Sequence, residues 1–282
     1  MVYLAPQSLS EALTALSSPT ARILAGGTDV FAVLDGPPPA GDLVDLTRIP
    51  ALRGIARKAD GGVVIGAAAT WAELCRAALP AAFDGLKAAS REVGSIQIQN
   101  AATLAGNLCN ASPAADGVPP LLTLDAQVAI AGPAGARRLP LADFILGPRR
   151  TALAPGELVS AIEIPPQPAG AAGAFVKLGA RRYLVISIAM VAAVLAPAAD
   201  GTIAHARVAV GACSPVAQRL AALEAALIGQ PMAEAAAVVA PAHVAGLAPI
   251  DDTRATASYR AGAALELTRR ALVAAASRSA AP

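Results

Sequence analysis

The stretch Thr103–Asp116, TLAGNLCNASPAAD, gathers Thr, Gly, two Asn, Ser and Asp with few bulky side chains between them. A segment that only fills a core has no need for this composition. Glycine lets main-chain N–H groups approach a ligand, and successive inward-facing N–H groups form an anion-binding concavity. A second glycine bend, ILAGGTD at Ile23–Asp29, has the same character, and Thr28 and Thr103 add hydroxyl groups. We predict that the two bends clasp a diphosphate from two sides.

Each of these signals also has a purely structural interpretation. A Gly-Gly pair after a strand is a plain turn in most proteins. Asp116 can instead cap the helix expected after it, and Lys177 on a strand can be an ordinary solvated charge. The chain has no GxGxxG after its first strand and no GxxxxGK[ST], so the bends are neither a Rossmann nor a Walker site by motif.

The composition favours a chain of several compact units that binds a small molecule or a protein. A length of 282 residues corresponds to two or three such units. Apolar residues make up 55% of the chain but aromatic residues only 3%, which predicts cores lined by Ala, Leu and Val. The 22 basic and 20 acidic residues are interspersed, whereas nucleic-acid binding leaves a concentrated basic footprint.

Cysteine usage and hydropathy predict a reducing, cytoplasmic location without a membrane span. Cys75, Cys109 and Cys213 are far apart and none belongs to a CxxC, so we expect no disulfide framework, no iron–sulfur cluster and no structural zinc held by this chain alone. The first residues lack a basic region followed by an apolar one, so no secretory signal is expected. The apolar run 184–199 is shorter than the roughly 20 residues of a membrane helix and contains Pro197, which favours a buried strand.

Local signals predict alternating helices and strands up to residue 164. A helix should begin after Ser8 or Ser10, and another at TWAELCRAAL, where Thr70 and Glu73 form a capping box. Expected strands and further elements are RILAGGTD (22–29), DLVDL (42–46) after a Pro-rich connection at Gly36–Gly41, GGVVIGA (61–67), a short helix feeding a strand over 119–132, and ELVSAIEI (157–164). This alternation predicts an α+β or α/β arrangement.

Consecutive Pro and Gly in PPQPAGAAGA, residues 165–174, predict a linker and a domain boundary near residue 170. Beyond it we expect a separate α+β unit, with three strands at 174–180, 185–195 and 203–212, followed by Ala-rich helices from Val216 onward. The predicted domains are residues 1–58, 59–169 and 170–282.

Several segments, in one order along the chain, carry a resemblance to a known family. They are ILAGGTDV (23–30), QIQNAATLAGNLCNASPAADGVPPLLTLDAQV (97–128), ELVSAIEIP (157–165), GAFVKLGARR (173–182) and VAVGACSPVAQRLAALEAAL (208–227). Together they closely resemble the FAD-binding medium subunit of the molybdenum hydroxylases, the family of xanthine, carbon monoxide and nicotine dehydrogenases. The resemblance implies an α+β fold with a PCMH-type, vanillyl-alcohol-oxidase-like FAD-binding domain of two subdomains. A C-terminal α+β domain, a three-stranded sheet with helices, would complete the pocket.

The resemblance also implies which residues hold FAD. The cofactor-binding positions that it transfers are Ile23, Leu24, Ala25, Gly26, Gly27, Thr28, Asp29, Val30, Val93, Thr103, Ala105, Gly106, Asn107, Asn110, Asp116, Val159 and Lys177. The two bends would bind the pyrophosphate, and Asp116 the ribityl or adenosine side. Val159 would pack on the flavin, Lys177 would lie near its N1/C2=O edge, and Val93 would touch the adenine.

Three positions depart from the family pattern. Ala105 stands where the first Gly of a pair is usual, Gln99 where Arg is frequent, and Tyr183 where no role can be transferred. FAD is expected to be non-covalent, because His205 and His243 have the character of ordinary surface or core residues. Cys109 lies near the clasp but is expected to be a small buried thiol.

The resemblance implies an electron-transfer subunit of a larger complex. A large partner would carry molybdopterin and hydroxylate the substrate, and a small partner would carry [2Fe-2S] clusters. Electrons would pass from those clusters through the FAD of this chain to an external acceptor, within a dimer of heterotrimers. The alternatives are a stand-alone FAD-dependent oxidase or dehydrogenase of the same fold, and an assembly subunit that has lost FAD. Neither the hydroxylated substrate nor the acceptor follows from this chain.

Overall fold

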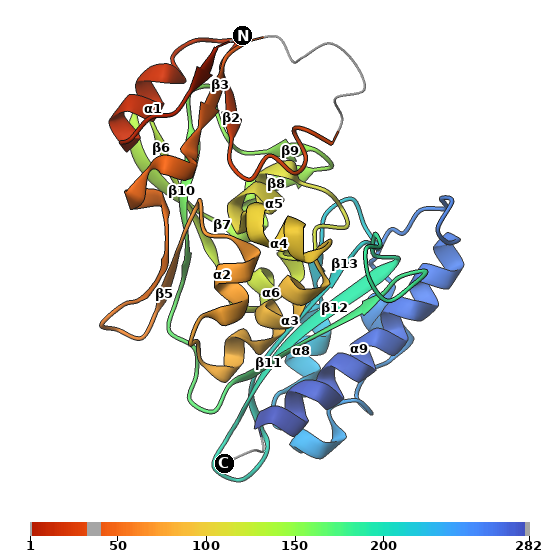
Figure 1. The fold of residues 1–282 in the computed structure, drawn as a ribbon. Helices are drawn as coiled ribbons and strands as arrows, with labels where there is room; N and C mark the ends of the chain where they lie inside the picture. The colour runs from red at the N-terminus through yellow and green to blue at the C-terminus, as the bar shows by residue number, and fades with distance from the viewer. Residues whose placement is uncertain (1, 33–40, 280–282) are drawn as a thin grey trace.

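The computed structural model describes residues 2–32 and 41–279, and these form three main sheets with helices between and beside them (Figure 1). Most of the Pro-rich connection predicted at Gly36–Gly41 lies outside the described residues. The strands are β1 (Tyr3–Leu4), β2 (Arg22–Leu24), β3 (Leu43–Asp45), β4 (Ile55–Arg57), β5 (Val63–Gly66), β6 (Gln127–Gly132), β7 (Gly135–Pro140), β8 (Ile145–Gly147), β9 (Arg150–Thr151), β10 (Leu158–Ile164), β11 (Ala172–Leu178), β12 (Ala189–Pro197), β13 (Ile203–Gly211) and β14 (Gln218–Arg219). The α-helices are α1 (Leu9–Ala15), α2 (Trp71–Arg76), α3 (Asp84–Glu92), α4 (Ile96–Ala101), α5 (Leu104–Asn110), α6 (Val118–Thr123), α7 (Leu141–Phe144), α8 (Ala221–Leu227) and α9 (Ala257–Ser279). The 3₁₀ turns are η1 (Leu46–Arg48), η2 (Pro50–Leu52), η3 (Ala81–Phe83), η4 (Met232–Glu234) and η5 (Pro241–Val244).

The N-terminal unit is a small parallel sheet in the order β1-β3-β2, with α1 beside it. Helix α1 begins after Ser8, whose Oγ accepts a hydrogen bond from the Glu11 N–H at 3.2 Å, so Ser8 rather than Ser10 is the cap. Strand β2 is an edge strand in this sheet and ends at Leu24. The first glycine bend therefore leaves the sheet directly beside the second unit.

The second unit is an antiparallel sheet in the order β4-β5-β10-β6-β7. Figure 1 shows α2 to α6 gathered in the middle of the molecule, between this sheet and the C-terminal one. The predicted capping box at the start of α2 is confirmed. Thr70 Oγ1 accepts from the Glu73 N–H at 3.2 Å, and the Thr70 N–H donates to Glu73 Oε2 at 2.7 Å.

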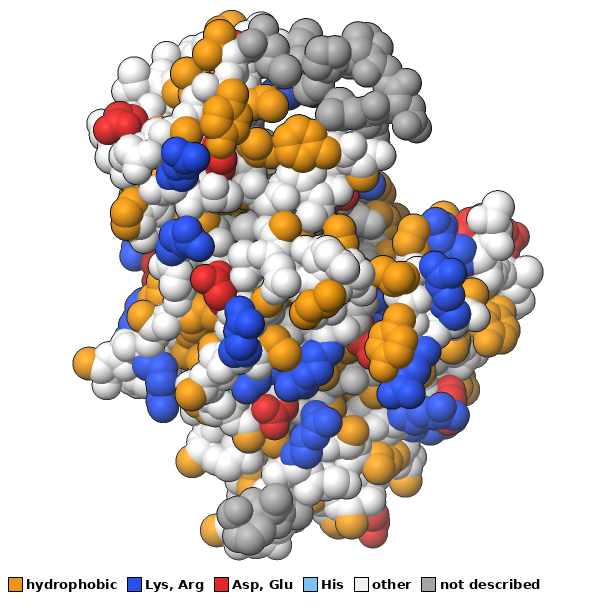
Figure 2. Space-filling model, in the orientation of Figure 1, with side chains coloured by type: hydrophobic (Ala, Val, Ile, Leu, Met, Phe, Trp, Pro, Cys, Tyr) orange, Lys and Arg blue, Asp and Glu red, His pale blue; other side chains and the backbone are white. Residues whose placement is uncertain are grey.

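The C-terminal unit is an antiparallel sheet in the order β11-β12-β13-β14, with α9 packed along β12 and β11. The predicted buried strand within 184–199 is confirmed at β12, where every residue but Pro197 is buried. No helix in the part of the chain that the structure describes is long and apolar enough to cross a membrane. On the face drawn in Figure 2, basic side chains are scattered among apolar atoms and do not form one continuous patch.

Two details of this C-terminal unit differ from the prediction. The described sheet has a fourth, two-residue strand, β14, where helix was expected from Val216 onward. The Ala-rich segment between α8 and α9 forms only the 3₁₀ turns η4 and η5. Gly229, Pro231 and Pro241 interrupt this segment, and proline removes a helix N–H donor, so its Ala content is not enough for an α-helix.

Candidate cofactor-binding site

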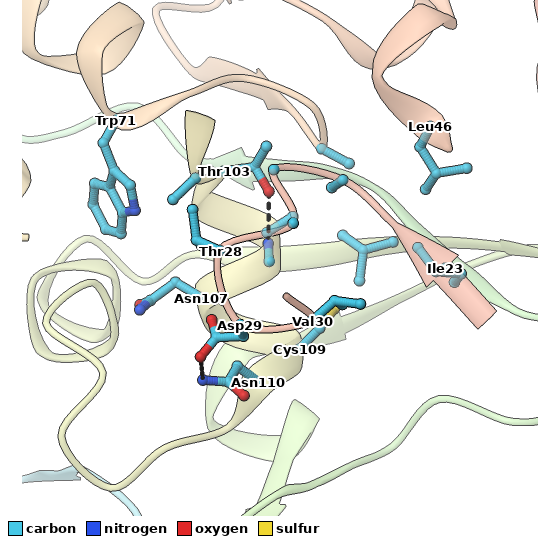
Figure 3. Close-up of a pocket in the computed structure, with 18 of the residues that line it drawn as sticks. Ile23, Thr28, Asp29, Val30, Leu46, Trp71, Thr103, Asn107, Cys109 and Asn110 are labelled. Atoms are coloured by element: carbon cyan, nitrogen blue, oxygen red, sulfur yellow. Dashed lines mark hydrogen bonds between the residues drawn. The ribbon is translucent and has the colours of Figure 1, made fainter. Parts of the chain in front are cut away.

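One cavity of about 420 Å³ lies between the two glycine bends, within the size range of cofactor pockets. Residues from both bends and from β10 line it (Figure 3). The predicted residues that line it are Ile23, Ala25, Gly26, Gly27, Thr28, Asp29, Val30, Val93, Thr103, Ala105, Gly106, Asn107, Asn110 and Val159. Of the residues transferred from the family, Leu24, Asp116 and Lys177 do not line the cavity.

The first bend presents main-chain N–H groups without internal partners. Gly27 has φ of +71°, a left-handed conformation that favours glycine, and its carbonyl accepts from the Phe31 N–H at 2.9 Å. Within the described residues, the N–H groups of Gly26, Gly27, Thr28 and Asp29 donate to no protein acceptor. Such a run of free donors on a cavity wall is what an anion-binding concavity requires.

The second bend is the first turn of helix α5 and not an irregular turn. Thr103 caps this helix, since its Oγ1 accepts from the Gly106 N–H at 3.0 Å (Figure 3). Ala105 follows as a helical residue and does not have positive φ. The departure at Ala105 therefore causes no backbone strain, because this position does not require glycine. The Ala105 N–H has no acceptor among the described residues and adds a donor from the second side.

The two bends are in direct contact although about 80 residues separate them in sequence. A Cβ added at Gly26 would lie 2.1 Å from the carbonyl oxygen of Ala101, the last residue of α4 and two positions before Thr103, so only glycine allows this approach. At the other end of the bends, Asn110 Nδ2 donates to Asp29 Oδ1 at 3.0 Å (Figure 3). The two bends therefore form one continuous wall of the cavity rather than two separate turns.

The side chains of Asn107 and Gln99 form hydrogen bonds that connect the segments around the cavity. Asn107 Oδ1 accepts from the Gly117 N–H at 3.2 Å, which fixes the start of α6 against α5. Gln99 Nε2 donates to the carbonyl oxygens of Arg91 and Val93 at 3.2 and 3.1 Å. Gln99, where relatives often have Arg, therefore ties α4 to the segment that carries Val93.

Asp116 and Lys177 pair with each other instead of lining the cavity. Lys177 Nζ lies 2.7 Å from Asp116 Oδ2, and the Ser187 hydroxyl donates to Asp116 Oδ1 at 2.7 Å. The two charged side chains are only 6% and 10% exposed, so Lys177 is not a solvated charge. Burial raises the pKa of Asp116 above its usual range, while the Lys177 and Ser187 contacts act in the opposite direction. Nor does Asp116 cap α6, which begins after Gly117 without a side-chain cap.

The Asp116–Lys177 pair joins the second unit to the C-terminal sheet, close to another residue that the resemblance assigns to the cofactor. Lys177 Nζ also approaches the Glu92 carbonyl oxygen at 3.4 Å, directly beside Val93. The resemblance assigns Val93 to the adenine and Lys177 to the flavin edge, which are opposite ends of FAD. Both assignments stay predictions.

Seven lining residues were not predicted: Leu46, Ala67, Trp71, Ile98, Ala102, Cys109 and Leu153. Most are aliphatic, and nothing in the sequence separates an aliphatic residue on a cavity wall from one in a core. Trp71 could have been singled out from the sequence, because it directly follows the Thr70 cap and is the single tryptophan of the chain.

The prediction that Cys109 is a small buried thiol is wrong, because Cys109 is exposed toward the cavity. The protein atoms packed around its sulfur nevertheless raise the pKa of the thiol to about 12 by desolvation. The thiol is therefore neutral at physiological pH and a poor nucleophile.

The other singled-out residues lie outside the cavity. Tyr183 is 55% exposed on the loop between β11 and β12, with the Arg182 guanidinium 5.2 Å from its ring centre. His205 is half-buried on β13, and burial lowers its pKa. His243 Nδ1 accepts from the Ala240 N–H at 3.1 Å in a local turn.

The hydrogen-bond donors and the apolar lining of the cavity fit a dinucleotide. Free N–H groups from two sides suit a diphosphate, and the Cβ-free surface at Gly26 and Gly27 permits close approach. The apolar lining on either side of the bends, such as Val93 and Val159, suits aromatic rings.

Comparisons with known proteins identify the family of the chain. A family model described as "FAD binding domain in molybdopterin dehydrogenase" matches residues 1–167, and one described as "CO dehydrogenase flavoprotein C-terminal domain" matches residues 174–275. The putative xanthine dehydrogenase FAD-binding subunit of Escherichia coli K12 is 36% identical over 59% of this chain, a match that spans 58% of that relative's own length. The carbon monoxide dehydrogenase medium chain of Hydrogenophaga pseudoflava is 30% identical over 97% of this chain and 96% of its own.

Solved structures give the same result for the fold. A carbon monoxide dehydrogenase chain from Hydrogenophaga pseudoflava superposes with a TM-score of 0.89 at 31% identity, over 99% of this chain and 98% of that one. Quinoline 2-oxidoreductase from Pseudomonas putida 86 gives 0.86 at 29% identity over the same shares. The chain therefore belongs to the family of FAD-binding medium subunits of the molybdenum-containing dehydrogenases.

Proposed function

We propose that this chain is the FAD-carrying electron-transfer subunit of a heteromeric molybdenum hydroxylase. The observation that carries the proposal is the cavity in which two glycine-bearing segments present unpartnered main-chain N–H groups from both sides. Bound FAD would supply the capacity to take up and release electrons, which no side chain on this cavity provides.

The residues of the chain would bind and orient the cofactor. The N–H groups of Gly26, Gly27 and Thr28 would hold the diphosphate from one side, and that of Ala105 from the other. Val159, 4% exposed on β10, would pack against a ring. The neutral Cys109 thiol favours non-covalent binding, because attachment through sulfur needs the thiolate.

Partner subunits would complete the electron path. Cys75 lies on α2, Cys109 on α5 and Cys213 in the loop after β13, and all three are free thiols, so they do not form a cluster-binding set. The [2Fe-2S] clusters would therefore belong to a small subunit and the molybdopterin to a large one, in a cytoplasmic dimer of heterotrimers. Relatives carry names of this kind, among them "Nicotine 6-hydroxylase medium subunit" from Paenarthrobacter nicotinovorans, 31% identical over 98% of this chain.

Native purification of the full chain, followed by absorption spectroscopy, tests the cofactor. We expect the two visible bands of oxidised flavin, and after acid precipitation we expect the flavin in the supernatant, as for a non-covalent cofactor. A folded chain that shows no flavin bands and takes up no added FAD would refute the proposal.

Co-purification from cells that express the neighbouring genes tests the partners. We expect iron and molybdenum in the complex, and no substrate turnover by the flavin-loaded chain alone. Turnover by that chain without metal-bearing partners would instead identify a stand-alone oxidase.

A further inference from the structure

Trp71 occupies the cavity wall without an assigned role. It is the first residue of α2, it is 1% exposed, and it lines the cavity from the side opposite Ile23 and Leu46 (Figure 3). Figure 3 shows its indole nitrogen on the edge of the ring that faces the two bends. This orientation directs a hydrogen-bond donor into the cavity.

The indole N–H has no acceptor within the described part of the chain. Indole Nε1 is a donor only, and buried tryptophans usually find a partner for it. The fully enclosed side-chain atoms without a partner among the described residues are His205 Nε2 and Arg260 Nε. Trp71 Nε1 is not one of them, so it keeps access to the cavity, where a ligand atom can accept its hydrogen.

The main chain fixes Trp71 relative to the second bend. The Trp71 N–H donates to the Ala102 carbonyl at 3.2 Å, and the Leu104 N–H donates to the Ala69 carbonyl at 3.2 Å, on either side of a bridge between Thr70 and Thr103. The ring also lies against Gly117, where an added Cβ would be 2.7 Å from it. The donor is therefore held in place before any ligand binds.

The Trp71 indole shares this side of the cavity with the Asn107 amide and with apolar residues (Figure 3). Val93, Ile98 and Ala102 line the same cavity and offer no side-chain hydrogen bond. In pockets of this kind a few polar groups fix the orientation of the ligand. A donor that the main chain holds in place therefore restricts which atom of a bound molecule can face it.

We infer that Trp71 is a cofactor-positioning residue whose indole N–H donates a hydrogen bond to an acceptor atom of FAD. This inference rests on the proposed function, because it takes FAD as the occupant of the cavity. The acceptor is a ring nitrogen or oxygen, or an oxygen of the linker, in either the flavin mononucleotide half or the adenosine diphosphate half.

The experiment uses the single tryptophan of the full chain as a reporter. FAD should quench Trp71 emission on binding, because flavin absorption overlaps tryptophan emission. FAD affinity is then measured by flavin fluorescence for Trp71→Phe and for protein in which tryptophan is replaced biosynthetically by 3-benzothienylalanine. The latter has the size of indole but no N–H, so it removes only the donor. We expect the FAD Kd to rise about 3- to 10-fold, the effect of one lost hydrogen bond.

Cys75→Ser on the same helix serves as the control, because Cys75 does not line the cavity, and its FAD Kd should stay unchanged. Titration with FMN and with ADP locates the acceptor: a loss of affinity for one of them supports the inference and identifies the half. Unchanged affinity of the benzothienylalanine protein for FAD, FMN and ADP overturns the role of Trp71 while the proposed function stands. Absence of FAD binding by the native chain refutes the proposed function itself.

Discussion

Replacing Gly26 by alanine tests whether the contact between the two bends forms the cofactor site. The added Cβ would lie 2.1 Å from the Ala101 carbonyl oxygen, whereas real Cβ contacts essentially never fall below 3.0 Å. The obstructing atom belongs to the main chain, so no side chain can rotate away. The two bends must separate by roughly 0.9 Å, the difference between those two distances.

A displacement of that size has two expected consequences. Overpacking of this kind costs about 1–3 kcal/mol in the free energy of unfolding. An N–H···O distance of about 2.7–3.2 Å lengthened by that amount no longer counts as a hydrogen bond. Bonds to a charged acceptor contribute about 1.5–3 kcal/mol each, so losing two from the first bend weakens FAD binding about 10²- to 10⁴-fold.

The assay is a fluorescence titration with FAD, together with thermal unfolding of the native chain and Gly26→Ala. Gly262→Ala is the matched control, since Gly262 lies in α9 and its Cβ would meet nothing within 4 Å. It should leave FAD binding unchanged and stabilise the chain by up to about 1 kcal/mol. If Gly26→Ala binds FAD within threefold of the native chain and melts at the same temperature, the close approach of the bends is not what builds the site.

Two further changes address charged pairs. Lys177→Met leaves the buried Asp116 carboxylate without its cation and should destabilise the chain by about 3–5 kcal/mol in chemical denaturation at neutral pH, with partial recovery when Asp116→Asn is added. Because the folded-state pKa of Asp116 is already raised, that cost should shrink as the pH falls toward 4, and a pH-independent cost would contradict the pairing. Hydrogen bonds from Arg137 at 2.7 and 2.6 Å lower the pKa of Glu157, so the pair stabilises the fold above the ordinary pKa of 4.5 and the effect is lost on acidification through the lowered value. Glu157→Gln should therefore flatten the acid limb of the stability profile, and identical acid limbs would show that the pair contributes nothing.

Local chemistry made the two bends predictable from the sequence. Gly26, Gly27 and the Thr103 cap are recognisable because turn and cap preferences act within a few residues. The same holds for the Thr70 cap of α2 and for the strand ended by Pro165. Where local preferences conflict, as in the Ala-rich segment before α9, the alanines favoured a helix but the proline and glycine residues prevented one.

Pairing between distant residues was decided by the tertiary structure. Asp116 and Lys177 were each transferred to the cofactor from their family positions. The fold places the two together, because a buried charge needs an opposite charge and Lys177 reaches Asp116 from the next sheet. In the same way, the exposure of Cys109 and the inward-facing indole of Trp71 depend on how α2 and α5 pack, which no local pattern encodes.

The sequence by itself thus determined the family, several of the main helices and strands, and the glycine-bearing segments that can bind a diphosphate, since these depend on residue type and short-range spacing. Only the tertiary structure decided that those segments touch and which side chains face the cavity between them. It also decided which charged side chains form ion pairs between the second unit and the C-terminal sheet. The physical reason is that close packing and the pairing of buried polar groups are satisfied across the whole molecule, between residues that the chain brings together only when it folds.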